Sequence, residues 1–152
     1  LNNEAKQLLK NDVKLIVIGR RDRIEASIIK KINYLEEKSK NNKGLNLVIA
    51  LDYGGREDIR QAIIKILKNY KNERDISLEL ISKNLMTKNI PDPDLIIRTS
   101  GEYRISNFLL WQSAYSEYVF VKCFWPEFNN NEYLKALEEF KSRERRFGSL
   151  NE

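Results

Sequence analysis

Short apolar runs alternate along this chain with longer segments in which apolar residues recur at helical spacing. The runs are rich in β-branched and aliphatic residues, which is typical of buried strands. They are Val13–Ile18, Leu45–Leu51, Leu95–Ile97 and Tyr118–Phe124. The segments with helical periodicity are Arg23–Ser39, Asp58–Tyr70, Ser77–Lys88, Asn107–Tyr115 and Asn130–Phe147. Strands that alternate with helices predict βα units, so we expect an α/β fold with a mainly parallel central sheet flanked by helices.

In such a sheet, ligands bind in the loops that follow the carboxyl ends of the strands. The loop Asp52–Arg56 carries paired glycines, Gly54 and Gly55, between a predicted strand and a predicted helix. Glycines at this position let the backbone turn sharply and present N–H groups at the positive end of a helix. The spacing matches neither GxGxxG nor a P-loop, so a plain tight turn is the simpler interpretation.

The loop after the third run holds two arginines, Arg98 and Arg104, on either side of a glycine turn. Arginines form charge-assisted, fork-shaped contacts with phosphate oxygens. Ser106 stands where an N-cap residue would precede a helix, and a helix N-terminus adds backbone donors. These groups together are suited to a diphosphate. The alternative is structural, with Arg98 paired to Glu102 or Asp94 and Ser106 acting only as a cap.

Two absences restrict the chemistry. The chain contains no histidine and one cysteine, Cys123, which excludes Ser-His and Cys-His catalysis, histidine-containing metal sites and cysteine zinc clusters within it. Catalysis must then rely on carboxylates, hydroxyls, Lys or Arg, or on a hard cation such as Mg²⁺ held by oxygen. Glu117 could ligate Mg²⁺ if it lay beside the arginine loop. By itself, a carboxylate at a strand end is more often a solvated edge residue.

The length and the charge of the chain limit the classes of protein to which it can belong. The 152 residues match one ordinary domain. The net charge of +5 favours an anionic partner, although it also serves solubility. Acidic residues are mixed among the basic ones, which disfavours a nucleic-acid binder. No apolar run approaches the ~18 residues of a membrane span, and Leu1–Asp12 lacks a secretory pattern. We therefore expect a cytoplasmic protein, in keeping with its lone cysteine.

Several motifs resemble one family of enzymes. Leu47–Arg56 resembles the central strand and turn of the cis-prenyltransferases. The block Pro93–Gln112 resembles the same family over a long and specific stretch, as do Tyr115–Glu117 and the terminal Arg143–Gly148. The matches follow the family's order and roughly its spacing, and the resemblance covers essentially the whole chain.

The resemblance implies a cis-prenyltransferase fold and a Mg²⁺-dependent condensation of isopentenyl diphosphate with an allylic diphosphate, usually farnesyl diphosphate. The implied product is a long-chain polyprenyl diphosphate, undecaprenyl diphosphate, which serves as a lipid carrier. Carried over by position, Arg98, Arg104 and Ser106 hold the isopentenyl diphosphate, and Glu117 helps to bind Mg²⁺. Arg146 and Gly148 belong to an Arg-x-Gly ending that reaches the active site across a homodimer. The resemblance further implies peripheral membrane contact for product release and no nucleic-acid partner.

The sequence departs from the family at its N-terminal side. Nothing in it matches the family's N-terminal strand and its His-x-Met-Asp-Gly-Asn-Gly-Arg loop, whose Asp and Arg hold the allylic diphosphate and Mg²⁺. We therefore expect residues 1–152 to be the C-terminal part of a single cis-prenyltransferase domain, without the catalytic Asp and inactive alone. Asp52 replaces a common Asn and adds negative charge, which Arg20, in place of the usual Asp, could partly offset. The alternative is a non-catalytic partner subunit of a cis-prenyltransferase complex, which the retained Arg98, Arg104, Ser106 and Glu117 disfavour.

Overall fold

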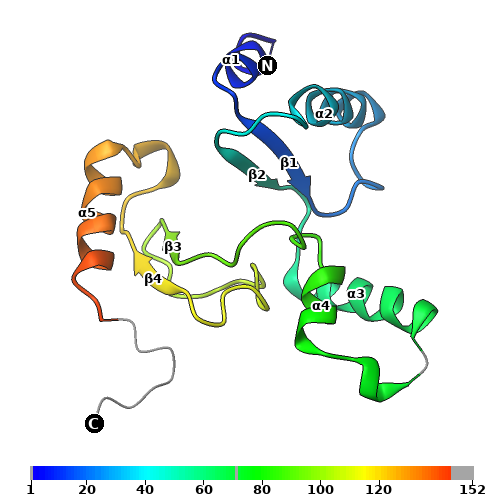
Figure 1. The fold of residues 1–152 in the computed structure, drawn as a ribbon. Helices are drawn as coiled ribbons and strands as arrows, with labels where there is room; N and C mark the ends of the chain where they lie inside the picture. The colour runs from blue at the N-terminus through cyan, green and yellow to red at the C-terminus, as the bar shows by residue number, and fades with distance from the viewer. Residues whose placement is uncertain (1, 71, 145–152) are drawn as a thin grey trace. The chain divides into compact units, whose positions relative to one another are not determined.

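The structure, a computed structural model, describes residues 2–70 and 72–144 (Figure 1). Its contacts divide the chain into two compact units, residues 1–89 and 90–152, which are described separately. The elements of the first unit are α1 (Asn2–Lys10), β1 (Lys14–Ile18), α2 (Ala26–Ser39), β2 (Asn46–Ala50), α3 (Gly55–Asn69), the 3₁₀ turn η1 (Glu73–Asp75) and α4 (Leu78–Asn84). Those of the second are β3 (Leu95–Arg98), β4 (Glu117–Phe120), the 3₁₀ turn η2 (Trp125–Glu127) and α5 (Asn130–Lys141).

The predicted parallel strands and flanking helices are confirmed. In the first unit β1 pairs with β2 in parallel, with Leu15 opposite Leu47. In the second unit β3 pairs with β4 in parallel, with Leu95 opposite Glu117. Among the described residues, hydrogen bonds join the strands as these two pairs and not as one continuous sheet.

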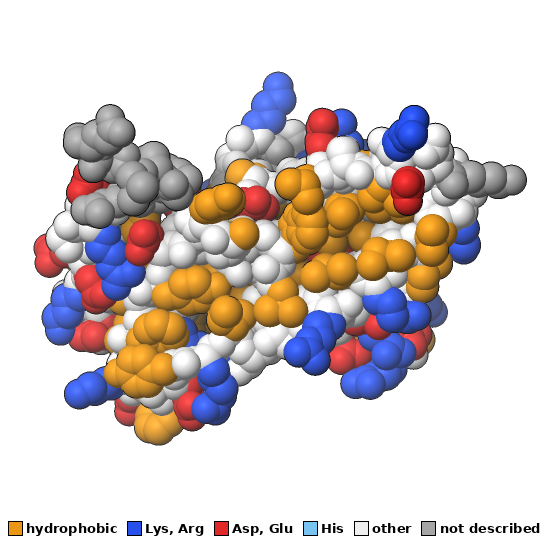
Figure 2. Space-filling view, turned by 90° about the horizontal axis from the view of Figure 1, so that it is seen from below, with side chains coloured by type: hydrophobic (Ala, Val, Ile, Leu, Met, Phe, Trp, Pro, Cys, Tyr) orange, Lys and Arg blue, Asp and Glu red, His pale blue; other side chains and the backbone are white. Residues whose placement is uncertain are grey.

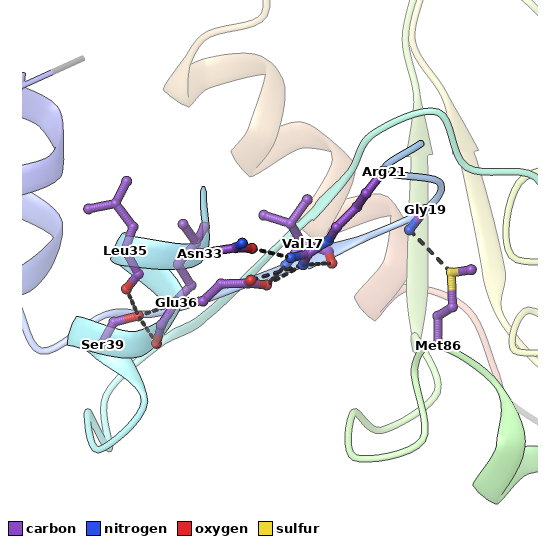
Figure 3. A network of polar contacts seen from close by, with 9 residues as sticks. Val17, Gly19, Arg21, Asn33, Leu35, Glu36, Ser39 and Met86 are labelled. Carbon is purple, nitrogen blue, oxygen red and sulfur yellow. Dashed lines mark hydrogen bonds and ion pairs between the residues drawn. The ribbon is translucent and has the colours of Figure 1, made fainter. Parts of the chain in front are cut away.

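Helix α2 packs against β1 and is joined to it by polar contacts. The buried hydroxyl of Ser39 accepts a hydrogen bond from the Leu15 N–H at 3.0 Å. A carboxylate oxygen of Glu36 accepts from the Val17 N–H at 2.9 Å and also from Arg21 Nη2 at 2.9 Å (Figure 3). Arg21 Nη2 donates in addition to the Val17 carbonyl at 3.1 Å. The carboxyl end of β1 is therefore fixed to α2 by an ion pair as well as by packing.

Strand β2 is more exposed than its apolar sequence predicts. Its outward row consists of alternate apolar residues, which are between 37% and 67% exposed. They are Leu45, Leu47, Ile49 and Leu51. Within the described residues β2 pairs with β1 alone, so its other edge carries no strand. Apolar side chains are likewise visible at the surface in Figure 2. The expectation of a buried strand is correct for β1, where Leu15, Val17 and Ile18 are buried, and wrong for β2.

A buried carboxylate links α3 to the segment after α4. Asp58, in the first turn of α3, is 1% exposed. Its two oxygens accept hydrogen bonds from the Tyr53 hydroxyl and the Met86 N–H, each at 2.9 Å. The carboxylate also complements the positive N-terminus of α3. The turn after β2 and the residues after α4 are therefore positioned by one side chain.

Replacement of Asp58 by Ala is expected to lower the free energy of unfolding by about 2–4 kcal/mol, because it removes a buried acceptor of two hydrogen bonds. Tyr53→Phe removes only one of these bonds and should cost about 1 kcal/mol. Urea unfolding of the two variants and of the parent protein measures both changes. Equal, small decreases in the free energy of unfolding of the two variants would contradict the proposed role of the carboxylate.

Strand alternation separates the second unit into two faces. Ile96 lies opposite Tyr118, and Arg98 lies opposite Phe120, so these four side chains share one face of the strand pair. Glu117 and Val119 lie on the other face. Helix α5 packs against β4 on the face of Glu117 and Val119. Val119 and α5 residues such as Ala136 line a common surface depression there. Arg98 and Glu117 are thus on opposite faces and at opposite ends of a four-residue strand pair.

The helix predicted over Asn107–Tyr115 is absent, and these residues form turns. Ser106, Asn107 and Leu109 all have positive φ angles, of 51°, 63° and 45°, which an α-helix does not allow. Strand β4 also ends at Phe120, earlier than the predicted Phe124. Each helix of the described residues is too short or too polar to span a bilayer.

Candidate functional site

The loop after β3 contains an unusual concentration of left-handed backbone. Besides Gly101, four non-glycine residues have positive φ. They are Ser100, Ser106, Asn107 and Leu109. Non-glycine residues rarely adopt this conformation, and clusters of them occur where surrounding structure enforces a functional geometry. Here the Ser100 N–H donates to the Cys123 carbonyl at 2.8 Å and the Gly101 N–H to the Val121 carbonyl at 2.9 Å. The loop is held against the chain that follows β4.

This loop closes over a pocket of about 180 Å³, here called the arginine pocket. Its lining residues are Ile96, Ile97, Arg98, Arg104, Ile105, Phe108 and Tyr118. The structure therefore brings Arg98 and Arg104 to one cavity, as the sequence predicts for a diphosphate site. Two guanidinium groups beside an apolar wall suit a ligand with an anionic head and a short hydrocarbon tail.

The ion pairs around the pocket are not those of the structural alternative, in which Arg98 pairs with Glu102 or Asp94. Within residues 2–70 and 72–144, the Arg98 side chain has no hydrogen bond or ion pair, so it is not neutralised by Glu102 or Asp94. Glu102 instead forms an ion pair with Arg104, whose side chain is 62% exposed. Such an exposed pair contributes little stability and exchanges readily for a stronger anion.

Ser106 does not act as a helix cap, since no helix begins there, and it is not among the residues that line the arginine pocket. The apolar wall was not anticipated from the sequence. Tyr118 and Phe120 are stacked, with ring centroids 6.0 Å apart, and Tyr103 lies 5.0 Å from Phe120. The signal that identifies Tyr118 is the strand register, because it lies opposite Ile96 on the face that carries Arg98.

Glu117 does not reach the arginine pocket. Its carboxylate accepts a hydrogen bond from Arg143 Nη1 at 2.9 Å, on the α5 side of the strand pair. The same Nη1 donates to the Tyr118 carbonyl at 2.8 Å, and Arg143 Nη2 pairs with Glu139. Hydrogen bonding to Glu117 is the largest of the effects that raise the pKa of Arg143. The position beside Glu117 is thus one that a cation already occupies.

The fit of Mg²⁺ to these residues can be judged from that arrangement. The described residues contain no group of three Cys, Asp, Glu or His side chains that could hold a metal ion. Magnesium, however, is often held by one or two carboxylates together with phosphate oxygens and water. The Glu117 side chain is 27% exposed and its carboxylate is already paired with Arg143, so by itself it is a poor site for a metal ion. Arg146 and Gly148, the predicted support across a dimer, lie outside the described residues.

Helix α3 and the loop after β1 line a second, strongly charged depression of about 440 Å³ in the first unit. Its lining includes Arg20, Asp22, Glu57 and Arg60. Arg20 pairs with Asp22 at 2.6 Å. The direct partner of Asp52 is Arg23, at 3.1 Å, and Arg20 adds a weaker attraction to the same carboxylate, so Arg20 offsets only part of the charge of Asp52. The two arginines of this depression carry carboxylate partners of their own, Arg20 with Asp22 and Arg60 with Glu57.

Glu57 should titrate at an unusually low pH, because hydrogen bonds from Arg60 and then Gln61 lower the pKa of its carboxyl group to about 2. A pKa below the unfolded value means that its contribution to stability is present above about pH 4.5 and is lost as the pH falls towards 2. The ¹³C shift of the Glu57 carboxyl measures the midpoint. In Arg60→Met the midpoint should move up towards 4.5, and an unchanged midpoint would contradict this cause.

The chain is similar in sequence to one family of proteins over nearly its whole length. The family model described as "Putative undecaprenyl diphosphate synthase" matches residues 1–148. Isoprenyl transferase from Staphylococcus haemolyticus is 45% identical over 149 residues, which are 95% of this chain and 58% of that protein. Isoprenyl transferase from Aquifex pyrophilus is 48% identical over 150 residues, which are 99% of this chain and 64% of that protein. The chain spans about three fifths of the length of these relatives.

Two solved structures have the same fold. Lavandulyl diphosphate synthase from Lavandula x intermedia, in complex with dimethylallyl diphosphate, matches with a TM-score of 0.91 and 35% identity over 97% of this chain and 66% of its own. A "probable undecaprenyl diphosphate synthase" from Campylobacter jejuni matches with a TM-score of 0.81 and 33% identity over 97% of this chain and 71% of its own. Both agree with the fold expected from the sequence.

Proposed function

Because this chain belongs to the undecaprenyl diphosphate synthase family of prenyltransferases, we propose that its protein condenses isopentenyl diphosphate with an allylic diphosphate, farnesyl diphosphate, to build a long-chain polyprenyl diphosphate with cis double bonds. The observation that carries the proposal is the arginine pocket, in which Arg98 and Arg104 meet beside Phe108 and Tyr118. A diphosphate head and a five-carbon tail match these two kinds of lining.

Each arginine has a distinct task in this proposal. Arg98, which carries no internal partner among the described residues, supplies a ready guanidinium fork for the diphosphate oxygens. Arg104 exchanges its exposed partner, Glu102, for the more highly charged ligand. Ser106 lies in the same loop, outside the lining of the pocket, and its hydroxyl is proposed as a further donor to the diphosphate. The three groups hold isopentenyl diphosphate so that its double bond faces the allylic substrate.

The reaction breaks the allylic C–O bond, forms a carbon–carbon bond and releases one proton and one diphosphate. No nucleophilic side chain is required, since the barrier is lowered by stabilising the charge of the leaving diphosphate. Mg²⁺ would supply that stabilisation, and Glu117, which is paired with Arg143 in the structure, would be its protein ligand. The catalytic Asp of this proposal belongs to a segment outside these 152 residues, as does most of the allylic site.

The proposal extends to assembly and location. The enzyme acts in the cytoplasm as a homodimer, in which Arg146 and Gly148 of one subunit support the site of the other, and it contacts the membrane surface to release its product. The second possibility, a non-catalytic partner subunit, is not favoured by the pocket, because a subunit with only a scaffolding role needs no unpaired arginine in a cavity.

An incorporation assay tests the proposal. The protein expressed from its complete coding sequence should transfer labelled isopentenyl units to farnesyl diphosphate in the presence of Mg²⁺, with dimethylallyl diphosphate as a second allylic substrate. Residues 1–152 alone should incorporate none, because the proposal assigns the catalytic Asp to a segment outside them. Incorporation by the 152-residue chain would refute that division of the site. If the complete protein is inactive alone but activity appears when it is mixed with another family member, the protein is instead a non-catalytic partner subunit.

A further inference from the structure

The register of β3 and β4 sets the order of the residues that line the arginine pocket. Ile96 lies opposite Tyr118 on one face of the strand pair. Arg98 follows on the same face, two residues further along β3 at its carboxyl end, which corresponds to about 7 Å along the strand. Arg104 belongs to the loop beyond Arg98. One end of the pocket is therefore cationic, and the other end is closed by the apolar Ile96 and Tyr118.

Tyr118 is held in place from two sides. Its ring stacks on the ring of Phe120, with centroids 6.0 Å apart and an interplanar angle of 14°. The Phe120 ring in turn lies 5.0 Å from the ring of Tyr103. The Tyr118 carbonyl accepts a hydrogen bond from Arg143 Nη1 at 2.8 Å. A side chain fixed in this way does not easily make room for a larger ligand, because its neighbours are packed as well.

The arginine pocket is small for a binding site. Its volume of about 180 Å³ is below the ~300 Å³ at which pockets for drug-sized ligands begin. Ile105 and Phe108 from the loop complete the apolar part of the lining. When a diphosphate head is fixed at the arginines, every additional methylene of its tail must fit against Ile96 and Tyr118. The far end of the pocket therefore limits the length of the tail.

We propose that Ile96 and Tyr118, here called the floor pair, determine which diphosphate the arginine pocket accepts, by limiting its tail to the length of an isopentenyl group. This inference rests on the proposed function and deepens it. The two substrates proposed there carry the same diphosphate head, so the arginines alone cannot distinguish between them. The floor pair admits the isopentenyl tail and excludes the longer farnesyl tail from this pocket.

Binding of two unreactive probes to the protein from its complete coding sequence tests the floor pair. Isopentyl diphosphate has a saturated five-carbon tail, and isohexyl diphosphate is one methylene longer. Isothermal titration should show that the shorter probe binds about tenfold more tightly, since one methylene that does not fit is worth at least about this factor. In an open apolar site the longer probe would bind more tightly instead. Binding that persists in Arg98→Ala occurs elsewhere and is subtracted.

Tyr118→Leu should abolish the preference for the shorter probe. Leucine is smaller than tyrosine, and the space that it leaves accommodates the extra methylene, so the longer probe should bind at least as tightly as the shorter one. Tyr118→Phe keeps the ring and its stacking on Phe120, so the tenfold ratio should persist. Tyr133→Leu is the matched control, because this tyrosine lies on α5, is 47% exposed and is not part of the pocket lining.

Ile96→Ala lengthens the pocket from the other strand and should shift the ratio in the same direction as Tyr118→Leu. A ratio of two affinities measured in one variant does not depend on the fraction of folded protein, so partial unfolding cannot imitate this effect.

An unchanged ratio in Tyr118→Leu or Ile96→Ala, a lost preference in Tyr118→Phe, or an equal shift in Tyr133→Leu would overturn the proposal. So would a parent protein that prefers the longer probe, or that binds neither probe through Arg98. Neither probe has a double bond that could condense, so prenyl transfer is not measured. A protein with the expected ratios that incorporates no isopentenyl units would lose the proposed function and keep the floor pair.

Discussion

Replacement of Arg98 by Ala in the complete protein is expected to reduce kcat/KM for isopentenyl diphosphate by about 100-fold, mainly through a higher KM. The guanidinium lines the arginine pocket and has no partner among the described residues, so its hydrogen bonds are available to the ligand. Two charge-assisted bonds to a diphosphate contribute about 3 kcal/mol, which corresponds to roughly that factor. Steady-state kinetics with a fixed, saturating allylic substrate measure the change.

Arg98→Lys separates charge from shape. It keeps the positive charge but loses the planar fork, so it should recover only part of the loss and leave kcat/KM about tenfold below the parent. Arg74→Ala, an exposed arginine of the 3₁₀ turn η1 in the other unit, controls for the loss of one cation and should leave the kinetics unchanged. Unaltered KM and kcat in Arg98→Ala would remove the main support for the proposed site.

The strands were predictable because their signal is local. β-branched runs bounded by glycine or proline gave β1 and β3 to within one residue, and the alternation with helices predicted parallel pairing. The exposure of β2 was not predictable in this way. A run such as Leu45–Leu51 indicates that apolar side chains need cover, but the cover itself comes from elements far away in the sequence.

The loop after β3 illustrates the limit of periodicity. Phe108–Trp111 resembles the start of an amphipathic helix, yet left-handed residues at Ser106, Asn107 and Leu109 exclude one. The loop that leads into this segment is held by contacts from outside it, for example the hydrogen bond from the Ser100 N–H to the Cys123 carbonyl. A sequence pattern indicates which secondary structure a segment prefers in isolation. Here the tertiary structure overrides the helical preference of this segment.

The site was only partly predictable for a geometric reason. Arg98 ends β3 and Arg104 lies six residues later in the loop that follows, so their proximity was expected from sequence distance alone. Glu117 lies on a different strand, and its face depends on a register that a single sequence does not specify. With Leu95 opposite Glu117, alternation turns the carboxylate towards α5 and Arg143. A register shifted by one residue would have turned it towards the arginines.

The largest loss of stability is expected from Gly19→Ala, at more than about 3 kcal/mol. Gly19 directly follows β1 and has a φ of +114°, and a Cβ atom there would lie 2.0 Å from the Leu51 carbonyl oxygen. That oxygen belongs to backbone that is itself held, because the Leu51 N–H donates to the Ile18 carbonyl at 2.9 Å. Relief would require the carboxyl ends of β1 and β2 to separate. The Met86 sulfur, which accepts from the Gly19 N–H (Figure 3), would be displaced as well.

Gly101→Ala distinguishes steric overlap from backbone strain. Gly101 also has a positive φ, of +64°, but the nearest atom to an added Cβ is the Lys122 Cα at 3.9 Å, an ordinary contact. Only the left-handed conformation is then unfavourable, which costs about 1–2 kcal/mol. Urea unfolding of both variants should therefore give clearly unequal losses. Equal losses would mean that the backbone around Leu51 yields easily, and that the close approach of the two strand ends contributes little to holding this edge of the sheet together.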